Sequence, residues 1–506
     1  MTRTTAAVLG TLCLAHAAAA QFIQQGSKLV GSGAVGTAFQ GRSGAIAADG
    51  NTAIIGGPSD NNYAGASWVF TRGGGVWSQQ GGKLVGAGAV GGAWQGFSAA
   101  ISADGNTAIV GGPYDQDYIG AAWVFTRSGG VWSQQGPKLA GADAVGGAWQ
   151  GSSVAISADG NTAVVGGFGD NSLAGAAWVY TRSGGVWSQE GSKLVGTDAV
   201  GDSQQGSSVA ISADGNTVLV GGFGDTSGLG AAWVYTRSGG VWSQQGSKLV
   251  GTGGVASPAQ GWSAAISADG NTAILGGQND NLGIGATWVF TRSGGVWSQQ
   301  GSKLVGTGAS DPHNHILQGK SVAISGDGNT AIVGGDHDDG YVGAVWVYTR
   351  REGAWFQQGS KLIGTGAVGV ARHGSSAAIS ADASTAIVGG YGDNANAGAA
   401  WVFVNSGCGK PWIIGQPQSE GVQSGQTATL SVTATGTAPL SYQWYRGDAG
   451  DTSTPVGGDV STFTTPPLIS TASFWVRVTN ACGTADSATA TISVGWRVRR
   501  HLQRST

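Results

Sequence analysis

A short unit that recurs at a nearly fixed interval constrains the fold of this chain more than any other feature. In Ser157–Gly167 the unit reads S-A-D-G-N-T-A-V-V-G-G, which is two short β-prone runs around an Asp-Gly-Asn corner. The Asp residues of the copies are Asp49, Asp104, Asp159, Asp214, Asp269, Asp327 and Asp382. Successive copies therefore lie 55 residues apart, with one interval of 58. A repeat of this length is typical of a propeller or a solenoid.

Each repeat predicts four antiparallel strands and no helix. In the third copy, Ser152–Ala158 alternates large and small residues, and Thr162–Gly167 returns after the corner as a second strand. A longer loop then leads to Ala176–Arg182, the third strand, and a Ser-Gly-Gly turn leads to the outermost strand at Val186–Gln189. Four such strands in sequence are typical of a propeller blade.

The recurring tryptophans give the number of blades. The third-strand Trp occurs seven times, at Trp68, Trp123, Trp178, Trp233, Trp288, Trp346 and Trp401. The fourth-strand Trp occurs six times, at Trp77, Trp132, Trp187, Trp242, Trp297 and Trp355. The missing copy matches Phe22–Val30, so we expect the N-terminus to supply the outer strand of the last blade, whose own chain ends at Val404. The prediction is an all-β, seven-bladed β-propeller closed by the N-terminal strand, with these aromatic residues packed between blades.

The repeat resembles the FG-GAP repeat of integrin-α-type propellers, in the form found in secreted bacterial proteins. The resemblance covers nearly all of residues 22–404, and it implies an extracellular propeller used for adhesion or binding. One departure concerns calcium. Integrin-type repeats carry an Asp-rich loop, whereas Ala158-Asp159-Gly160-Asn161 offers one carboxylate, and calcium takes six to eight oxygen ligands. The corners are therefore interpreted as hairpin turns.

Composition and the N-terminal residues favour a protein outside the cytosol. Charged residues make up 10% of the 506 residues and the net charge is −3, which argues against a nucleic-acid groove. Met1–Ala20 combines Arg3, an apolar run and a small-residue cleavage site, as in a secretory signal peptide. No later segment reaches 18 apolar residues, so we expect no transmembrane segment and a secreted or cell-surface location.

One face of the propeller is predicted to carry the ligand site. The short corners make one face uniform, whereas the other face bears Gly-Gly-x-x-Asp followed by variable residues, and binding sites favour variable loops on rigid scaffolds. The candidate ligand residues are Asp60, Asp115, Asp170, Asp225, Asp280, Asp338 and Asp393. They are either a ring of acidic groups around a central depression, or Asx-turn residues that cap their own loops.

Blade six breaks the repeat and offers candidate metal ligands. It has three extra residues in Ser310–Leu317, and the candidates are His313, His315, Asp336 and His337, with Asp338 nearby and His373 at the matching connection of blade seven. Imidazole and carboxylate groups suit zinc or another transition metal, although ordinary solvated loop residues explain them as well. No motif such as H-E-x-x-H supports a metal, so no cofactor is predicted, and calcium or a transition metal is the alternative.

The composition changes after Val404. Residues 405–417 form a predicted linker, residues 418–495 a predicted immunoglobulin-like domain, and residues 496–506 a basic tail. Trp444 matches the buried Trp of that fold, and Val432 and Val476 replace its two inter-sheet cysteines. Cys408 and Cys482 are predicted to form a disulfide, with two free thiols as the alternative.

Two functional hypotheses follow. The first is a non-catalytic, extracellular or cell-surface binding or adhesion protein that presents its propeller loop face to a glycan or protein ligand. The alternative is a secreted polysaccharide hydrolase or lyase with its site on the same face. Spacing alone does not exclude a pair of catalytic carboxylates, but Walker and nucleophile-elbow motifs are absent from the sequence.

Overall fold

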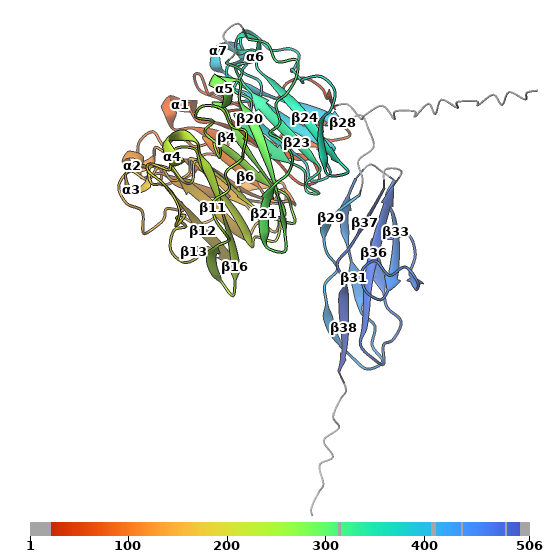
Figure 1. Cartoon of the computed structure of the whole chain (residues 1–506). Coiled ribbons are helices and arrows are strands. Elements are labelled where there is room, and N and C mark those ends of the chain that lie inside the picture. Colours follow the sequence, from red (N-terminus) through yellow and green to blue (C-terminus); the bar gives the residue numbers. More distant parts are fainter. Residues whose placement is uncertain (1–21, 312–314, 406–410, 437–438, 481–482, 496–506) are drawn as a thin grey trace, which may run out of the picture.

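Each copy of the repeat forms part of a four-stranded antiparallel sheet in the computed structural model, which describes residues 22–311, 315–405, 411–436, 439–480 and 483–495. The first three sheets are β2 (Ser43–Ile46), β3 (Thr52–Gly57), β4 (Ala66–Gly73) and β5 (Val76–Gln79); β6 (Ser98–Ile101), β7 (Thr107–Gly112), β8 (Ala121–Ser128) and β9 (Val131–Gln134); and β10 (Ser153–Ile156), β11 (Thr162–Gly167), β12 (Ala176–Ser183) and β13 (Val186–Gln189). The next three are β14 (Ser208–Ile211), β15 (Thr217–Gly222), β16 (Ala231–Ser238) and β17 (Val241–Gln244); β18 (Ser263–Ile266), β19 (Thr272–Gly277), β20 (Ala286–Ser293) and β21 (Val296–Gln299); and β22 (Ser321–Ile324), β23 (Thr330–Gly335), β24 (Ala344–Arg351) and β25 (Ala354–Gln357). The seventh contains β26 (Ser376–Ile379), β27 (Thr385–Gly390) and β28 (Ala399–Asn405). The chain is thus all-β, with seven propeller-like blades followed by a C-terminal immunoglobulin-like domain (Figure 1).

The fourth strand of the seventh sheet is β1 (Phe22–Gln24), from the N-terminal end of the described chain. It pairs antiparallel with β28, with Phe22 opposite Asn405 and Gln24 opposite Phe403. Phe22 is buried in the core that β28 shares with its neighbours, whereas Ile23 is 52% exposed. This pairing joins segments from the two ends of the propeller sequence.

Small residues in the inner strands allow neighbouring blades to approach closely. In β11 every residue is buried, and a Cβ atom added to Gly166 would lie 2.2 Å from the carbonyl oxygen of Gly206 in the next repeat. Any side chain at this position would push the two blades apart. The glycine content, 95 of 506 residues, thus has a packing role in the propeller.

The third-strand tryptophans fill the spaces between blades, as the sequence predicts. All seven are fully buried. Trp178 packs in a cluster that includes Ile109 and Val124 of the preceding blade, and its indole Nε1 donates to Asp143 Oδ1 at 2.7 Å. Ring faces are thus buried while the polar edge is satisfied, which favours one fixed arrangement of the blades.

The Asp-Gly-Asn corners are hairpin turns that also link neighbouring blades. Asp159 accepts hydrogen bonds from Ser157 Oγ and from the backbone and side-chain nitrogens of Asn161. Burial acts to raise the pKa of Asp159, but these hydrogen bonds outweigh it and lower the pKa below the usual value. Asn161 Oδ1 in turn accepts from Arg182, which reaches Gln135 of the preceding blade at 3.0 Å. The carboxylate is therefore committed to the turn.

The second loop of each blade contains a single tight turn. These turns are α1 (Asp60–Tyr63), α2 (Asp115–Tyr118), α3 (Asp170–Leu173), α4 (Asp225–Gly228), α5 (Asp280–Gly283), α6 (Asp338–Tyr341) and α7 (Asp393–Asn396). Their second and third residues have left-handed φ angles, such as 47° at Asn171 and 55° at Ser172. Among the residues described, none of the helices has the length and apolar character needed to cross a membrane.

The C-terminal domain is a β-sandwich built around Trp444. Its strands are β29 (Trp412–Gly415), β30 (Glu420–Gln423), β31 (Thr429–Ser431), β32 (Thr433–Thr435), β33 (Ser441–Arg446), β34 (Pro455–Val456), β35 (Thr462–Thr464), β36 (Ala472–Asn480), β37 (Gly483–Asp486) and β38 (Ala490–Gly495). Trp444 is fully buried with Val432 and Val476 in one core, so the two valines occupy the interior as apolar residues. Because β29 pairs with β32, the domain begins inside the predicted linker. Cys408 and Cys482, and with them the predicted disulfide, lie outside the described residues.

Candidate functional site

The seven loop-face aspartates are buried. Their side chains are at most 1% exposed, and each carboxylate pairs with a lysine. The pairs are Asp60–Lys83, Asp115–Lys138, Asp170–Lys193, Asp225–Lys248, Asp280–Lys303, Asp338–Lys361 and Asp393–Lys28. The distance from lysine Nζ to Asp Oδ2 is 2.5 or 2.6 Å in all but the Asp115–Lys138 pair, which has the same atoms in contact.

The other oxygen of each carboxylate holds the connection between blades. Asp170 Oδ1 accepts the backbone N–H of Val145 at 2.7 Å, and Asp338 Oδ1 accepts that of Ser310 at 2.8 Å. These carboxylates tie a loop to the connection that precedes its blade and to a lysine that follows it. Because both oxygens face protein donors and the side chains are buried, they do not form an accessible acidic ring. The alternative prediction, an Asx-turn that caps its own loop, is not found either, because Asp170 Oδ1 accepts from Val145, 25 residues earlier in the chain.

The blade-six candidates for a metal site do not converge. Asp338 is engaged with Lys361, whereas Asp336 is buried and His315 is exposed. His337 Nε2 lies 2.9 Å from a guanidinium nitrogen of Arg372 and 3.9 Å from Asp336 Oδ1. Burial above all lowers the pKa of His337, and His313 lies outside the described residues. No group of three or more His, Cys, Asp or Glu residues suited to a metal ion occurs in the described part of the chain.

His373 of blade seven has a packing role. It is fully buried and its ring lies 4.1 Å from that of Trp401. Its Nδ1 lies 3.0 Å from the carbonyl oxygen of Val342. In the other six blades the equivalent position is a buried glutamine, such as Gln150. His373 therefore belongs to the repeat framework.

Variable residues instead meet where the inner strands end, on the face opposite the Asp-Gly-Asn corners. The first strands of all seven blades line an apolar axial channel. The residues just before these strands are Arg42, Phe97, Ser152, Ser207, Trp262, Lys320 and Ser375. The residues just after the second strands are Pro58, Pro113, Phe168, Phe223, Gln278, Asp336 and Tyr391. Because antiparallel neighbours start and end at the same edge, both sets surround one mouth of the channel.

Aromatic rings form a continuous series over blades two to five. This aromatic arc consists of Trp94, Tyr114, Tyr118, Trp149, Phe168, Phe223 and Trp262. Successive ring centroids are 4.5 to 6.4 Å apart. All are half-buried except the exposed Tyr118. These rings therefore differ from the fully buried third-strand tryptophans: they are anchored, but part of each reaches solvent.

Positively charged residues continue the aromatic arc around the channel mouth on blades six, seven and one. The aromatic arc and these cations together are called the belt. This cationic arc consists of Lys320, Arg372 and Arg42. Lys320 Nζ lies 4.6 Å from the ring centroid of Trp262, and the Arg42 guanidinium lies 4.5 Å from that of Phe97, so both ends of the cationic arc contact aromatic residues. Arg372 stacks on Tyr341 and Tyr391, at 4.6 and 5.5 Å.

The charges of the cationic arc shift one another's pKa values. Burial lowers the pKa of Lys320 to about 8, attraction to Asp336 opposes this, and repulsion from Arg42 and Arg372 adds to it. Burial likewise lowers the pKa of Arg42 and raises that of Tyr391. Asp336 is the carboxylate that contributes to all three shifts, and its Oδ1 has no hydrogen-bond partner among the described residues.

The backbone beneath the belt is left-handed at the same place in every blade. The residues are Phe39, Trp94, Trp149, Gln204, Ala259, Leu317 and Arg372, with φ between 53° and 60°. Such angles favour glycine and cost about 1 kcal/mol or more for other residues. This glycine-rich chain nevertheless places a side chain at all seven positions, and four of these side chains are aromatic or basic. The fold thus projects variable side chains here at an energetic cost.

Sequence reasoning selected the same face of the propeller but did not single out the residues of the belt. The signal was present in the repeat itself, because the position after Gln-Gly or His-Gly reads Arg, Phe, Ser, Ser, Trp, Lys and Ser in otherwise uniform surroundings. The seven aspartates, in contrast, recur in every copy, as expected for a structural role.

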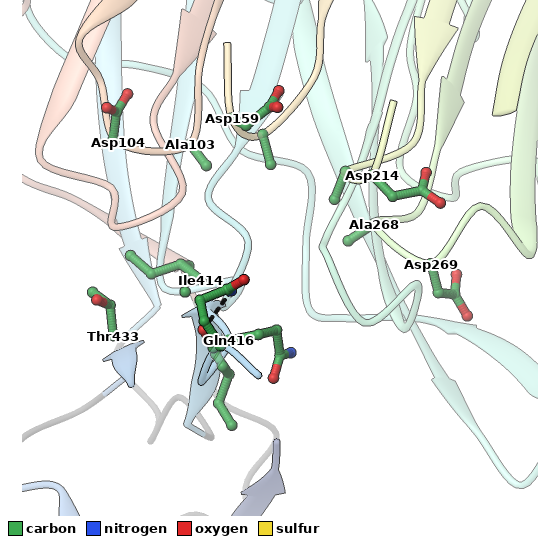
Figure 2. A pocket seen from close by; sticks show the side chains of 14 residues that line it. Ala103, Asp104, Asp159, Asp214, Ala268, Asp269, Ile414, Gln416 and Thr433 are labelled. Carbon is green, nitrogen blue, oxygen red and sulfur yellow. Dashed lines mark hydrogen bonds between the residues drawn. The ribbon is translucent and has the colours of Figure 1, made fainter. Parts of the chain in front are cut away.

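A second hollow lies on the opposite face, between the propeller corners and the immunoglobulin-like domain. The cavity has a volume of about 790 Å³. Figure 2 shows Asp104, Asp159, Asp214 and Asp269 on its propeller side and Ile414, Gln416 and Thr433 on the other. The hydrogen bonds within the corners already occupy Asp104 and Asp159. This cavity therefore marks where the two domains face each other, and the belt lies on the face away from it.

Comparison with known proteins identifies the second domain and offers distant parallels for the propeller. Residues 413–495 match the model of an immunoglobulin-like domain described as CHU_C associated. The β-propeller domain of the trilobed protease from Pyrococcus furiosus is 9% identical, over 68% of this chain and 90% of its own, with a TM-score of 0.34. A putative TolB from Agrobacterium tumefaciens is 14% identical, over 60% of this chain and 88% of its own, with a TM-score of 0.33. The titin M3 domain is 17% identical, over 17% of this chain and 96% of its own, with a TM-score of 0.14. None of the curated proteins matches the chain.

Proposed function

We propose that this protein is a non-catalytic, extracellular or cell-surface binding protein whose propeller presents the aromatic arc to a glycan. The observation that carries the proposal is the arc itself, a series of rings, half-buried except for Tyr118, with successive centroids 4.5 to 6.4 Å apart around one mouth of the axial channel. A pyranose ring presents an apolar face of C–H groups and an edge of hydroxyl groups. Aromatic rings held by the protein complement the apolar face at little cost in side-chain entropy.

Several features support a location outside the cytosol. Met1–Ala20 resembles a secretory signal peptide, and residues 22–404 resemble FG-GAP repeats of secreted bacterial propellers. The domain at residues 413–495 matches a CHU_C-associated immunoglobulin-like model, and such domains are typical of bacterial surface proteins. This domain faces the corners and not the belt, which suits a module that holds the propeller while the binding face remains accessible.

We infer further that β1 closes the propeller ring. Its pairing with β28 joins the first and last repeats, and Lys28 pairs with Asp393 across the same junction. A closed ring keeps the seven blades in fixed positions. The rings of the aromatic arc, which come from four blades, would then keep their spacing before a ligand binds, and preorganisation of this kind favours affinity.

The hydrolase alternative is weaker because the channel mouth lacks a pair of free carboxylates among the described residues. Glycoside hydrolysis commonly uses two carboxyl groups on either side of the scissile bond. Among the described residues of the two sets at the channel mouth, Asp336 is the one acidic residue, and the seven loop aspartates are engaged with lysines. A lyase remains the enzyme to test against, because it needs a cation and a base instead of two acids.

Alanine substitution in the arc tests the proposal. Trp149→Ala suits the backbone, since Ala259 occupies the equivalent left-handed position in blade five. After glycan-array screening of residues 21–506, we expect Trp149→Ala to weaken binding of the best glycan about tenfold in calorimetry, because one lost stacking contact of this kind is worth about 1–3 kcal/mol. The control is Phe356→Ala, which removes a 55% exposed ring on β25, away from the belt.

Two results would overturn the proposal. Unchanged affinity in Trp149→Ala would remove the arc from the binding site. Release of unsaturated or reducing ends from the bound glycan by the wild-type protein would show that it is an enzyme.

A further inference from the structure

Most lysines and arginines of the propeller are bound by the blade framework, and two half-buried ones are not. Seven lysines pair with the loop aspartates. Six arginines, Arg72, Arg127, Arg182, Arg237, Arg292 and Arg350, bind the Asn of their own corner and a Gln or Glu of the preceding repeat unit. Within the described residues, the side chains of Arg42 and Lys320 have neither a hydrogen bond nor an ion pair, although both are half-buried. The blade framework therefore does not require these two cations.

The same two residues occupy a position where other blades have serine. Ser152, Ser207 and Ser375 stand at the equivalent place before the first strand, so neither the backbone nor the packing demands a long basic side chain. Arg42 and Lys320 also lie close enough to repel each other, and Arg372 adds a third positive charge. Keeping three cations together in a half-buried place is unfavourable without an anion.

The protein supplies too little negative charge to balance them. In the described part of the belt, Asp336 is the one carboxylate that faces the cationic arc, which leaves two positive charges uncompensated. Asp336 is 1% exposed, so its carboxylate is a buried counter-ion of the cationic arc and lies beyond the reach of a ligand. The uncompensated positive charge is suited to a ligand that carries an oxyanion.

Trp262 connects the two arcs. Its ring lies 4.7 Å from that of Phe223, at the end of the aromatic arc, and Lys320 Nζ lies 4.6 Å from the same ring. A sugar ring stacked at Trp262 would thus bring its substituents beside Lys320. Arg42 makes the corresponding contact with Phe97 at the other end of the belt.

We propose that the glycan is anionic, and that Lys320, Arg42 and Arg372 bind carboxylate or sulfate groups on its sugars while the aromatic arc stacks against their rings. This inference rests on the proposed glycan-binding function and specifies its ligand class. Both groups are oxyanions fixed to a pyranose, which is the chemistry that ammonium and guanidinium groups recognise.

The test measures binding of charged and neutral forms of the same polymer to residues 21–506 by calorimetry. Oligogalacturonate is compared with its carboxyl-reduced form, and dextran sulfate oligomers with dextran. We expect at least one charged probe to bind about tenfold or more tightly than its neutral counterpart. The probe that shows the preference identifies carboxylate or sulfate as the recognised group.

Charge-removing variants assign that preference to the arc. Lys320→Ser and Arg42→Ser install the residue that other blades carry and should each reduce the preference for the charged probe about tenfold, with little change for the neutral probe. Arg351→Ser, which removes an exposed cation at the β24–β25 turn, is the matched control and should leave the preference intact.

Each outcome bears on one proposal or the other. Equal binding of charged and neutral probes, or an equal loss for both in Lys320→Ser, would overturn the anionic ligand while leaving glycan binding in place. Failure of every charged and neutral glycan to bind, on the array and in calorimetry, would overturn both.

Discussion

The Asp–Lys pairs allow a quantitative test of their structural role. Asp170 is 1% exposed, and its carboxylate contacts Lys193 Nζ at 2.6 Å and the N–H of Val145 at 2.7 Å. The Lys193 side chain is 18% exposed, so its ammonium group can turn to water when the partner is removed. Asp170→Ala then leaves mainly the Val145 N–H without an acceptor. We expect a loss of about 2–3 kcal/mol in the free energy of unfolding, most of it from that buried donor.

Removal of the lysine should destabilise the protein more than removal of the aspartate. Lys193→Met leaves the buried carboxylate of Asp170 without its counter-ion. Removing one partner of a buried ion pair costs about 3–5 kcal/mol. The double variant Asp170→Leu/Lys193→Met removes both charges and should be more stable than Lys193→Met alone, since the isolated charge disappears. The order of stability, with Lys193→Met lowest, follows from the unequal burial of the two partners.

Urea unfolding monitored by circular dichroism measures these differences. Asp202→Asn is the control, because it alters an exposed aspartate in the connection between blades three and four and should change stability by no more than about 0.5 kcal/mol. At temperatures where the variants are folded, Asp170→Ala should bind the best glycan as the wild type does. The reasoning is refuted if Asp170→Ala keeps its stability but loses glycan binding, because the carboxylate would then be a ligand residue.

Two further predictions concern pH and the N-terminal strand. Because the pKa of Lys320 is about 8 in the folded protein, below its value in the unfolded chain, the ammonium group is lost as pH rises through 8. Binding of the charged probe should therefore weaken between pH 7 and 9.5, and calorimetry of Lys320→Ser should show that step to be absent; a step of the same size in the variant would contradict the assignment. The titration of Lys320 by itself stabilises the ligand-free fold over this range, because at this site the unfolded chain binds more protons, so the weaker binding does not come from unfolding caused by Lys320. In the N-terminal strand, Phe22→Ala should lower the free energy of unfolding by about 3 kcal/mol, whereas Ile23→Ala, at the exposed neighbouring position, should cost less than about 0.5 kcal/mol in the same urea titration. Equal effects would mean that β1 does not hold the last blade.

The repeated units made the blades predictable from the sequence. Alternation in Ser152–Ala158 and the Asp-Gly-Asn corner specify a hairpin through local rules alone, and sevenfold repetition removes the ambiguity that a single copy would leave. The burial of Trp178 and of Trp444 also followed from the sequence. The start of the second domain did not, because Trp412–Gly415 is short and lies between two prolines, so it resembled a linker.

The candidate site was less predictable because partners distant in sequence determine what an aspartate does. Asp60 and Lys83 lie 23 residues apart, and the same separation recurs for the pairs in blades one to six. In blade seven the lysine is Lys28, which stands 365 residues from Asp393 because the N-terminus supplies that strand. A lysine present once for every aspartate was a signal of pairing that the sequence contained. The sequence pattern did not show that each aspartate and its lysine lie within contact distance across the loop.

Comparison among the blades also separates positions that the fold requires from positions that it leaves variable. Positions that keep their residue in all the blades, such as the loop aspartates, bind neighbouring loops and lysines. The position before the first strand holds serine in three blades, so larger residues there are not needed for folding. In the other four blades it holds Arg42, Phe97, Trp262 and Lys320, which contact one another in cation–ring pairs around the channel mouth. Variation at a structurally permissive position, combined with contact among the variants, is what the proposed ligand site predicts, and the serine variants of Arg42 and Lys320 separate this role from a contribution to packing between blades.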